Sequence, residues 1–423
     1  VITGGPGTGK TSIINKLENI GHTVFHESSR EIIQKYKKLG HNQLFLSDPI
    51  KFSEILLENR IRQYENAEKL VLQFDIQRTA ELLNGYDDEN YGKSDGLRSL
   101  VQENGGCDIV IGGPPCQAYS LAGRIRDEHG MENDYRNYLF ESYLKTIEGL
   151  GSPKIILFEN VPGMLSAAPG GVSIIKRIKE AFNNVGYDII DNIRENALFN
   201  VSDFGVPQNR RRVILIGLKK ESYGNNTRKY LKNIYDNIRS MADEDKMTVC
   251  EALNGMDKFF PLKNGTSING KKYSHEPQVG KLKNSIPRYH NKRDIDIFKL
   301  LAEDIDKGIN KYTSTKELKK LYTKKTGKES TVHKYYVLRN DKPSNTIPAH
   351  LYKDGLRHIH PDPSQARTIT VREAARLQSF PDDFFFEGPS GANYKMIGNA
   401  VPPVFSKVLA KALYSFLSTE KSI

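Results

Sequence analysis

Short apolar runs, each followed by glycine or polar residues, divide the middle of the chain into predicted strands. Two such runs lie at 108–113 and 154–161, and a third lies within 206–217. Runs this short and apolar are typical of strands buried on both faces of a parallel sheet. Helical patterns at about 137–149 and 172–184 supply the connections that parallel strands need. The pattern predicts an α/β fold with a doubly wound, mostly parallel sheet.

Chemically active side chains stand at the ends of these runs. Cys116 follows the first run and Glu159 ends the second, while a Gln-Asn-Arg-Arg-Arg segment precedes the third. Open α/β sheets bind their ligands at the edge where parallel strands end. A thiolate, a carboxyl group and a guanidinium suit attack on an electron-poor heterocycle, followed by protonation of its ring nitrogen. Taken singly, such a cysteine is more often a buried thiol, so only the combination indicates a site.

The chain opens with a strand-like run, a glycine loop and a helical pattern. The loop fits the phosphate-loop pattern at Gly4, Gly9, Lys10 and Thr11, which makes ATP with magnesium a candidate ligand. Residues 1–70 resemble the start of a small AAA-type ATPase, but one strand and a few helices cannot cover a sheet. We therefore expect a P-loop strand–helix fragment, and we expect the natural chain to start upstream of its first residue.

Positive charge is concentrated in one stretch of the chain. The whole sequence carries 62 Lys and Arg against 51 Asp and Glu, a net charge of +11. Residues 219–340 hold 27 Lys and Arg against 15 Asp and Glu, a net of +12, so the remainder is almost neutral. Such a module suits a polyanion, because neutralised phosphates release counterions. A solvated, lysine-rich surface is the plainer alternative.

Composition argues against a membrane protein, a disulfide-rich protein and a metal-binding protein. No stretch reaches the roughly 18 apolar residues of a membrane helix, so we expect a cytoplasmic protein without a membrane partner. Three cysteines cannot build a disulfide framework. The 10 histidines show no metal-ligand spacing, and we expect no metal site.

Five ordered sequence blocks carry a family resemblance. They are Gly-Gly-Pro-Pro-Cys-Gln-Ala-Tyr-Ser at 112–120, Glu-Asn-Val-Pro-Gly-Met at 159–164, Gln-Asn-Arg-Arg-Arg at 208–212, Arg-Thr-Ile-Thr-Val-Arg-Glu-Ala-Ala-Arg-Leu-Gln-Ser-Phe-Pro-Asp at 367–382 and Gly-Asn-Ala-Val-Pro-Pro at 398–403. Together they resemble the motifs of DNA cytosine-5 methyltransferases over about 75–415. The resemblance implies a methyltransferase-like sheet with a smaller, basic target-recognition domain.

The resemblance also implies roles for single residues. Cys116 would attack carbon 6 of a cytosine flipped out of the duplex. Glu159 would engage the ring nitrogen, and Arg212, with Arg210 nearby, would contact the base carbonyl. The substrate-binding residues would be Pro114, Gln117, Ser120, Asn160 and Gln208. The methyl donor, S-adenosyl-L-methionine, would contact Asp75, Ile76, Asn399 and Ala400.

The same resemblance divides the chain and suggests its partners. We expect a P-loop fragment at 1–70, the catalytic core at 71–219, a target-recognition domain at 220–340 and the C-terminal part of the core at 341–423. The target-recognition range coincides with the basic stretch, so we expect double-stranded DNA as the partner. We further expect a monomer, of restriction-modification or orphan type, with a cognate restriction endonuclease as a candidate partner.

The chain departs from the family pattern at its start. The Phe-X-Gly-X-Gly loop, which holds the methionine part of the donor in this family, is absent, and the phosphate-loop segment stands in its place. A chimeric reading frame joined near 74–75, a natural fusion and a nucleotide switch all remain open. The competing functions are an active methyltransferase, a catalytically impaired DNA-binding relative and a P-loop ATPase or kinase.

Overall fold

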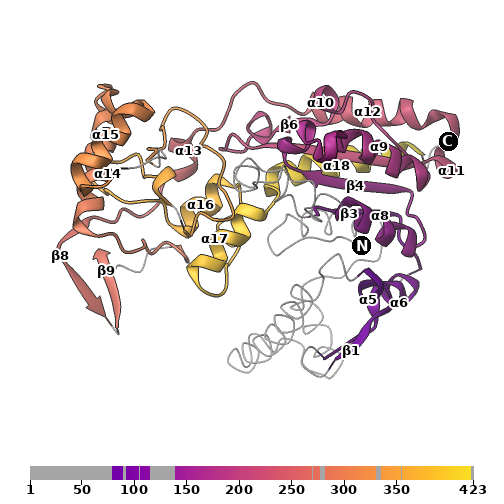
Figure 1. Cartoon of the computed structure of the whole chain (residues 1–423), viewed down its shortest axis with the longest axis horizontal. Helices are drawn as coiled ribbons and strands as arrows, with labels where there is room; N and C mark the ends of the chain where they lie inside the picture. The colour runs from indigo at the N-terminus through magenta and orange to yellow at the C-terminus, as the bar shows by residue number, and fades with distance from the viewer. Residues whose placement is uncertain are drawn as a thin grey trace, which may run out of the picture.

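The computed structural model (Figure 1) describes most of the chain after residue 78. The described residues are 79–88, 92–103, 105–114, 139–268, 270–276, 282–329, 335–353 and 355–420. The strands are β1 (Tyr86–Asp88), β2 (Gly92–Ser94), β3 (Ile109–Gly112), β4 (Ile155–Asn160), β5 (Tyr187–Ile189), β6 (Leu198–Asn200), β7 (Arg211–Lys219), β8 (Pro261–Ile268) and β9 (Lys271–His275). The helices are α5 (Thr79–Asn84), α6 (Gly96–Glu103), α8 (Leu139–Gly149), α9 (Ile174–Asn184), α10 (Ile193–Asn196), α11 (Lys220–Tyr223), α12 (Thr227–Ser240), α13 (Val249–Leu253), α14 (Lys292–Asp306), α15 (Thr315–Thr326), α16 (Val371–Leu377), α17 (Ser390–Asn399) and α18 (Pro403–Glu420).

The central sheet contains one reversed strand. Its order is β3-β4-β7-β5, and β6 also pairs with β7. Strands β3 and β4 are parallel, whereas β7 runs antiparallel to β4, β5 and β6. Four of the five described strands therefore share one direction. The α/β architecture is confirmed, but most pairings among the described strands are antiparallel, because β7 lies in the middle of the sheet.

Helices cover both faces of this sheet. Phe158 of β4 packs edge-on against Tyr143 of α8 and Phe182 of α9. On the opposite face, Phe199 of β6 stacks on Tyr235 of α12 and contacts Phe405 of α18. Strands β4 and β7 are buried along most of their length, as expected for a sheet that helices cover on both faces.

The sheet's apolar core extends past residue 219, where we expected the catalytic core to end. Leu231, Ile234 and Ile238 of α12 belong to the same core as β4 and β7. The apolar face of α12 has to be covered, and it packs on β7 and α18. The sheet unit therefore continues through α12.

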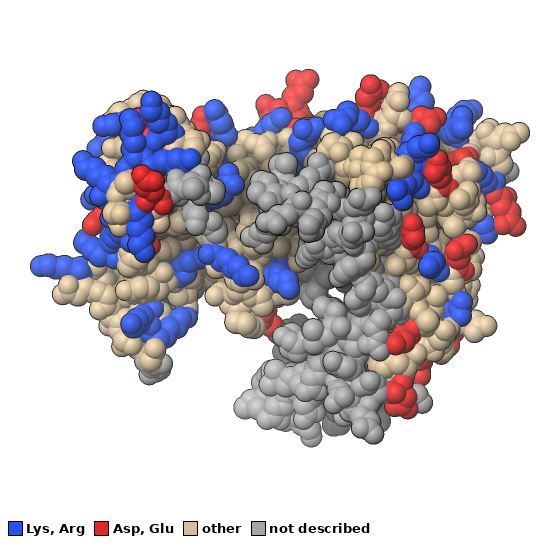
Figure 2. Space-filling model, in the orientation of Figure 1, with Lys and Arg blue, Asp and Glu red and all other residues tan. Residues whose placement is uncertain are grey.

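A second lobe lies at the other end of the molecule and contains β8, β9, α14 and α15 (Figure 1). Its apolar core combines Phe298 and Leu301 of α14 with Val337 and Ile359. Helices α13, α16 and α17 lie between the lobe and the sheet and share a separate core. Lys and Arg side chains gather over α14 and α15 and along the β8–β9 hairpin (Figure 2).

Buried charged and polar groups tie the lobe to α16. Arg367 donates to both carboxylate oxygens of Glu373, at 2.7 and 2.6 Å, and neither side chain is exposed. Glu373 also accepts from the backbone N–H of Thr370, whose hydroxyl caps the helix in return. Although burial opposes ionisation, the Arg367 guanidinium and these hydrogen bonds lower the pKa of Glu373 to about 2.

Four histidines are buried in the same lobe. Desolvation lowers the pKa of His275, His358 and His360 to about 4 and the pKa of His290 to about 3. These side chains are therefore neutral at pH 7 in the folded protein, whereas free histidine titrates near pH 6.5.

Acid should weaken the folded state through these histidines. Between about pH 4 and 6.5 the unfolded chain binds more protons, so their contribution is complete above pH 6.5 and is lost as the pH falls toward 4. Each histidine contributes up to about 1.4 kcal/mol per pH unit. We expect the free energy of unfolding in urea to be lower at pH 5 than at pH 7. His290→Gln should reduce this difference, whereas His350→Gln, at an exposed position, should not. Equal values at the two pH levels would contradict the prediction.

Candidate active site

A carboxylate and a guanidinium meet at the carboxyl edge of β4. Arg212 Nε lies 2.8 Å from Glu159 Oε1, and the two side chains are 12% and 20% exposed. In the β4–β7 register Glu159 stands opposite Ile214, so Arg212, two residues away on β7, projects from the same face. The reversed strand starts at the edge where β4 ends. The first residues of β7 therefore reach a residue at the end of β4.

The end of β3 lies beside the same carboxylate. A Cβ atom at Gly113 would stand 3.0 Å from Glu159 Oε2, which only glycine avoids without a shift of the carboxylate. Pro114, which follows, is buried. Gly113 belongs to a quoted sequence block, but the sequence offered no reason to single it out, because the close approach is between strands.

Asn160 lies next to Glu159 but on the other face of β4. Its side chain is 2% exposed, and Oδ1 accepts from the backbone N–H of Val161 at 2.8 Å. This bond holds the turn that leaves the strand. The side chain thus supports the edge of the site.

Arg210, which we expected beside Arg212 in catalysis, lies in a buried joint instead. Its side chain is 2% exposed and donates to the carbonyl oxygens of Ile347, Gly398 and Ala400 at 2.9 to 3.1 Å. Buried carbonyl groups need donors, and one planar guanidinium reaches all three. With these bonds made, the position supports a structural role for Arg210.

Gln208 belongs to the same joint. It is fully buried, its Nε2 donates to Leu377 O at 3.2 Å and to Gln378 Oε1, and its Oε1 accepts from the N–H of Ile347 at 2.9 Å. Gln378 in turn donates to Ile397 O and Ala400 O. Gln208 therefore fixes, through buried hydrogen bonds, the segment that leads into β7. Its side chain is not accessible to a substrate. Gln378 was not singled out from the sequence, although it lies in one of the five blocks.

Asn399 and Ala400, the two C-terminal residues that we expected to contact the methyl donor, differ in solvent exposure. Asn399, the last residue of α17, is exposed. Ala400 is fully buried, and its carbonyl already accepts from Arg210 and Gln378. The exposed amide of Asn399 fits a contact with a polar ligand, whereas Ala400 is better placed to support the joint.

Several predicted site residues lie outside the described residues. They are Gly4, Gly9, Lys10, Thr11, Asp75, Ile76, Cys116, Gln117 and Ser120.

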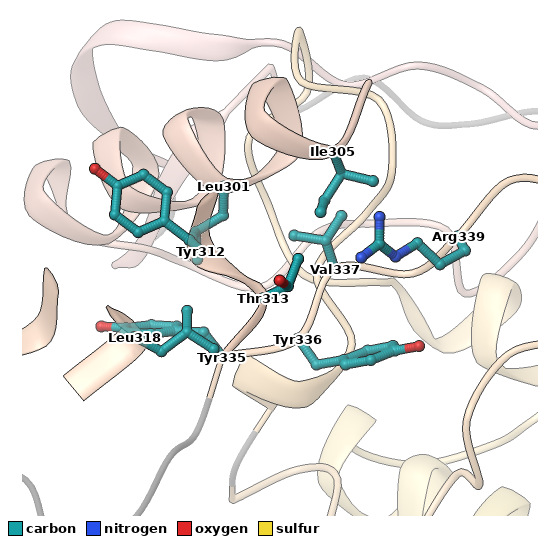
Figure 3. A pocket seen from close by; sticks show the side chains of 9 residues that line it. All are labelled: Leu301, Ile305, Tyr312, Thr313, Leu318, Tyr335, Tyr336, Val337 and Arg339. Atoms are coloured by element: carbon teal, nitrogen blue, oxygen red, sulfur yellow. The ribbon is translucent and has the colours of Figure 1, made fainter. Parts of the chain in front are cut away.

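A cavity of about 50 Å³ lies in the second lobe, and neither Glu159 nor Arg212 lines it (Figure 3). It is lined by side chains of α14, α15 and residues 335–339, among them Leu301, Tyr335 and Arg339. Pockets for small organic ligands are typically about 300 Å³ or larger. The cavity is too small to hold a nucleobase or a methyl donor, so it is not a candidate reaction site.

The part of the chain that the structure describes contains neither a membrane-spanning helix nor a cluster of metal ligands. No described helix is both long enough and apolar enough to cross a membrane. Within the same residues, no group of three or more His, Cys, Asp or Glu could hold a metal ion.

Comparison with known proteins identifies the family. Residues 86–415 match the model of the C-5 cytosine-specific DNA methylases, and residues 1–81 match an AAA domain. The chain belongs to the C-5 cytosine-specific DNA methylase family. The resemblance inferred from the five sequence blocks is confirmed.

Individual relatives are bacterial type II methyltransferases. The chain is 36% identical over 326 residues to M.Bpa9945I of Bacillus paralicheniformis, covering 72% of this chain and 70% of the relative. It is 29% identical over 314 residues to M1.HphI of Haemophilus parahaemolyticus, covering 74% and 70%. Among solved structures, it is similar to the S. pombe Dnmt2 methyltransferase, with 14% identity, a TM-score of 0.43 and coverage of 74% and 79%.

Measurements of the free energy of unfolding can test whether Arg210 is structural and its neighbour Arg211 is not. Arg210→Met would remove a donor from the buried carbonyl groups of Ile347, Gly398 and Ala400, of which Ala400 keeps its bond from Gln378, and we expect the free energy of unfolding to fall by about 3 kcal/mol. Arg211→Met changes the charge equally at an exposed position and should stay within about 0.5 kcal/mol of the parent. Urea unfolding of the three proteins measures both values. Similar losses in both variants would argue against the structural role of Arg210.

Proposed function

We propose that the chain is a DNA cytosine-5 methyltransferase that acts on a cytosine flipped out of duplex DNA. The observation that carries the proposal is the Glu159–Arg212 pair beside Gly113, at the edge where β3 and β4 end. Family membership supports cytosine as the target and DNA as the substrate. The type II methyltransferases among its relatives support a role in restriction and modification.

Arg212 orients the Glu159 carboxyl group in this proposal. Its Nε occupies Oε1, which leaves Oε2, the oxygen beside Gly113, for the base. Glu159 then holds a proton at the ring nitrogen of cytosine, and this proton makes carbon 6 more electrophilic. A guanidinium that binds one carboxylate oxygen fixes the orientation of the second oxygen. The second oxygen must point at the ring nitrogen if it is to hold the proton there.

Cys116 is proposed as the nucleophile. In the sequence it follows Gly113 by three residues, and Gly113 lies beside Glu159. Its thiolate adds to carbon 6, so that carbon 5 gains electron density and accepts the methyl group. Loss of the proton at carbon 5 then allows the carbon–sulfur bond to break. S-adenosyl-L-methionine supplies the methyl group when bound, and Asn399 is the described residue whose exposed side chain fits a contact with it.

The basic second lobe is proposed to bind the duplex. Its lysines and arginines give it the charge that phosphates require, as the blue surface of Figure 2 indicates. Because α12 packs with the sheet, we propose that the target-recognition module begins after α12 rather than at residue 220.

A second candidate is a DNA-binding relative that does not transfer methyl groups. The printed residues contain no Phe-X-Gly-X-Gly loop, and methyl transfer needs a bound donor whereas duplex binding does not. The match at 1–81 indicates that the N-terminal segment is similar to an AAA domain. It does not support binding of ATP or magnesium.

Transfer of tritiated methyl groups from S-adenosyl-L-methionine to mixed-sequence duplex DNA tests the proposal. We expect incorporation at carbon 5 of cytosine, abolished in Cys116→Ser because the adduct cannot form. Lys10→Ala should leave the rate unchanged. Duplex binding without any incorporation would instead support the second candidate.

Removing the acidic proton should lower the rate without lowering DNA affinity. We expect Glu159→Gln to reduce methyl transfer by about 100-fold or more, the usual contribution of a positioned acid. Glu148→Gln, at an exposed position on α8, removes the same charge and should leave the rate unchanged. The two variants should bind duplex DNA equally. Full activity in Glu159→Gln would rule out the proposed proton donor.

A further inference from the structure

The β8–β9 hairpin is an exposed two-stranded ribbon on the second lobe (Figure 1). Every residue from Lys263 to Ile268 is exposed, as are Lys271 and Lys272 on the returning strand. No Asp or Glu occurs between residues 261 and 275, so the three lysines are the ribbon's only formal charges. Two-stranded ribbons are seldom stable alone, so exposure on this scale points to a partner for the hairpin.

The base of the hairpin is held firmly in the lobe. His275 Nε2 lies 2.8 Å from Gln365 O, and Ser274 Oγ accepts from the backbone N–H of His290 at 2.9 Å. Ser274 and His275 are 5% and 2% exposed. The ribbon is therefore presented from a fixed stem, which lowers the entropic cost of binding through its outer part.

Strand β8 carries an irregularity in its pairing with β9, and polar side chains are exposed around it. Pro261 pairs with His275 and Thr266 pairs with Tyr273, so β8 has more residues than β9 between these two pairs. Such a bulge re-aims the side chains of the longer strand. The outer part of the ribbon then offers Asn264, Thr266 and Ser267, whose side chains donate and accept hydrogen bonds.

Shape and charge fit one partner, duplex DNA. The major groove is about 12 Å wide and admits a two-stranded ribbon, whereas the minor groove is about half as wide. Lysines neutralise the flanking phosphates, while amide and hydroxyl groups hydrogen-bond base edges. The hairpin also belongs to the lobe over which basic side chains gather in Figure 2.

We propose that the β8–β9 hairpin enters the major groove, where Asn264, Thr266 and Ser267 read base edges and Lys263, Lys271 and Lys272 contact phosphates. The proposal rests on the proposed function, since it assumes that duplex DNA is the substrate. It adds the element that selects the target sequence.

Selection from a randomised duplex pool, using the full chain, tests the reading residues. We expect the parent protein to enrich a defined sequence. The variant Asn264→Ala, Thr266→Ala, Ser267→Ala should still bind duplex DNA but lose about tenfold or more of the base preference at adjacent positions. The matched control, Asn233→Ala with Thr323→Ala, removes exposed polar groups from α12 and α15 and should keep the parent's sequence profile.

A second variant tests the lysines separately. Lys263→Gln, Lys271→Gln, Lys272→Gln should weaken binding to all duplexes alike and flatten the dependence of log affinity on log salt by about 2.7, since each phosphate contact contributes about 0.9. Unchanged profiles and salt dependence in both variants would overturn the hairpin proposal. If the parent methylates cytosine and the hairpin variants keep its full sequence preference, the proposed function stands and only the role of the hairpin is wrong. A parent that binds no duplex would overturn both.

Discussion

The antiparallel pairing of β7 with β4 is the constraint on which both the candidate site and the interlobe joint depend. Because β7 runs against its neighbours, its first residues lie where β4 ends, and Arg212 reaches Glu159. The residues just before β7 meet the end of α17 through Arg210. A parallel strand at this position would carry the arginines to the opposite edge. One reversed strand thus positions both the candidate site and the contacts of Arg210 with the end of α17.

The region between sheet and lobe is held by polar groups that are buried and paired. Gln208, Arg210 and Gln378 satisfy carbonyl groups that no helix or strand could satisfy, and Arg367 is neutralised by Glu373. Such groups are costly to bury unless every bond is made, so they favour one relative arrangement of the elements. The paired groups therefore hold α16 and α17 in a defined position against the start of β7.

Sequence patterns predicted the strands at 108–113 and 154–161 because buried strands are short and apolar, and they are confirmed as β3 and β4. They also brought Glu159 and Arg212 to one site, and the structure joins them in an ion pair. The roles of Arg210 and Gln208 were not accessible in the same way. A run of three arginines does not indicate which one is buried, because Ile347, the partner of both Arg210 and Gln208, lies more than 130 residues away in the chain.

The sequence by itself determined the family, the α/β class and the concentration of positive charge, since ordered motifs, apolar periodicity and composition are local properties. Tertiary structure decided which side chain faces the site and which supports it. It also decided that α12 belongs with the sheet and that the β8–β9 hairpin stands exposed on the lobe. These outcomes depend on strand register and on contacts between distant segments, and the free energy of such contacts is absent from any short stretch of sequence.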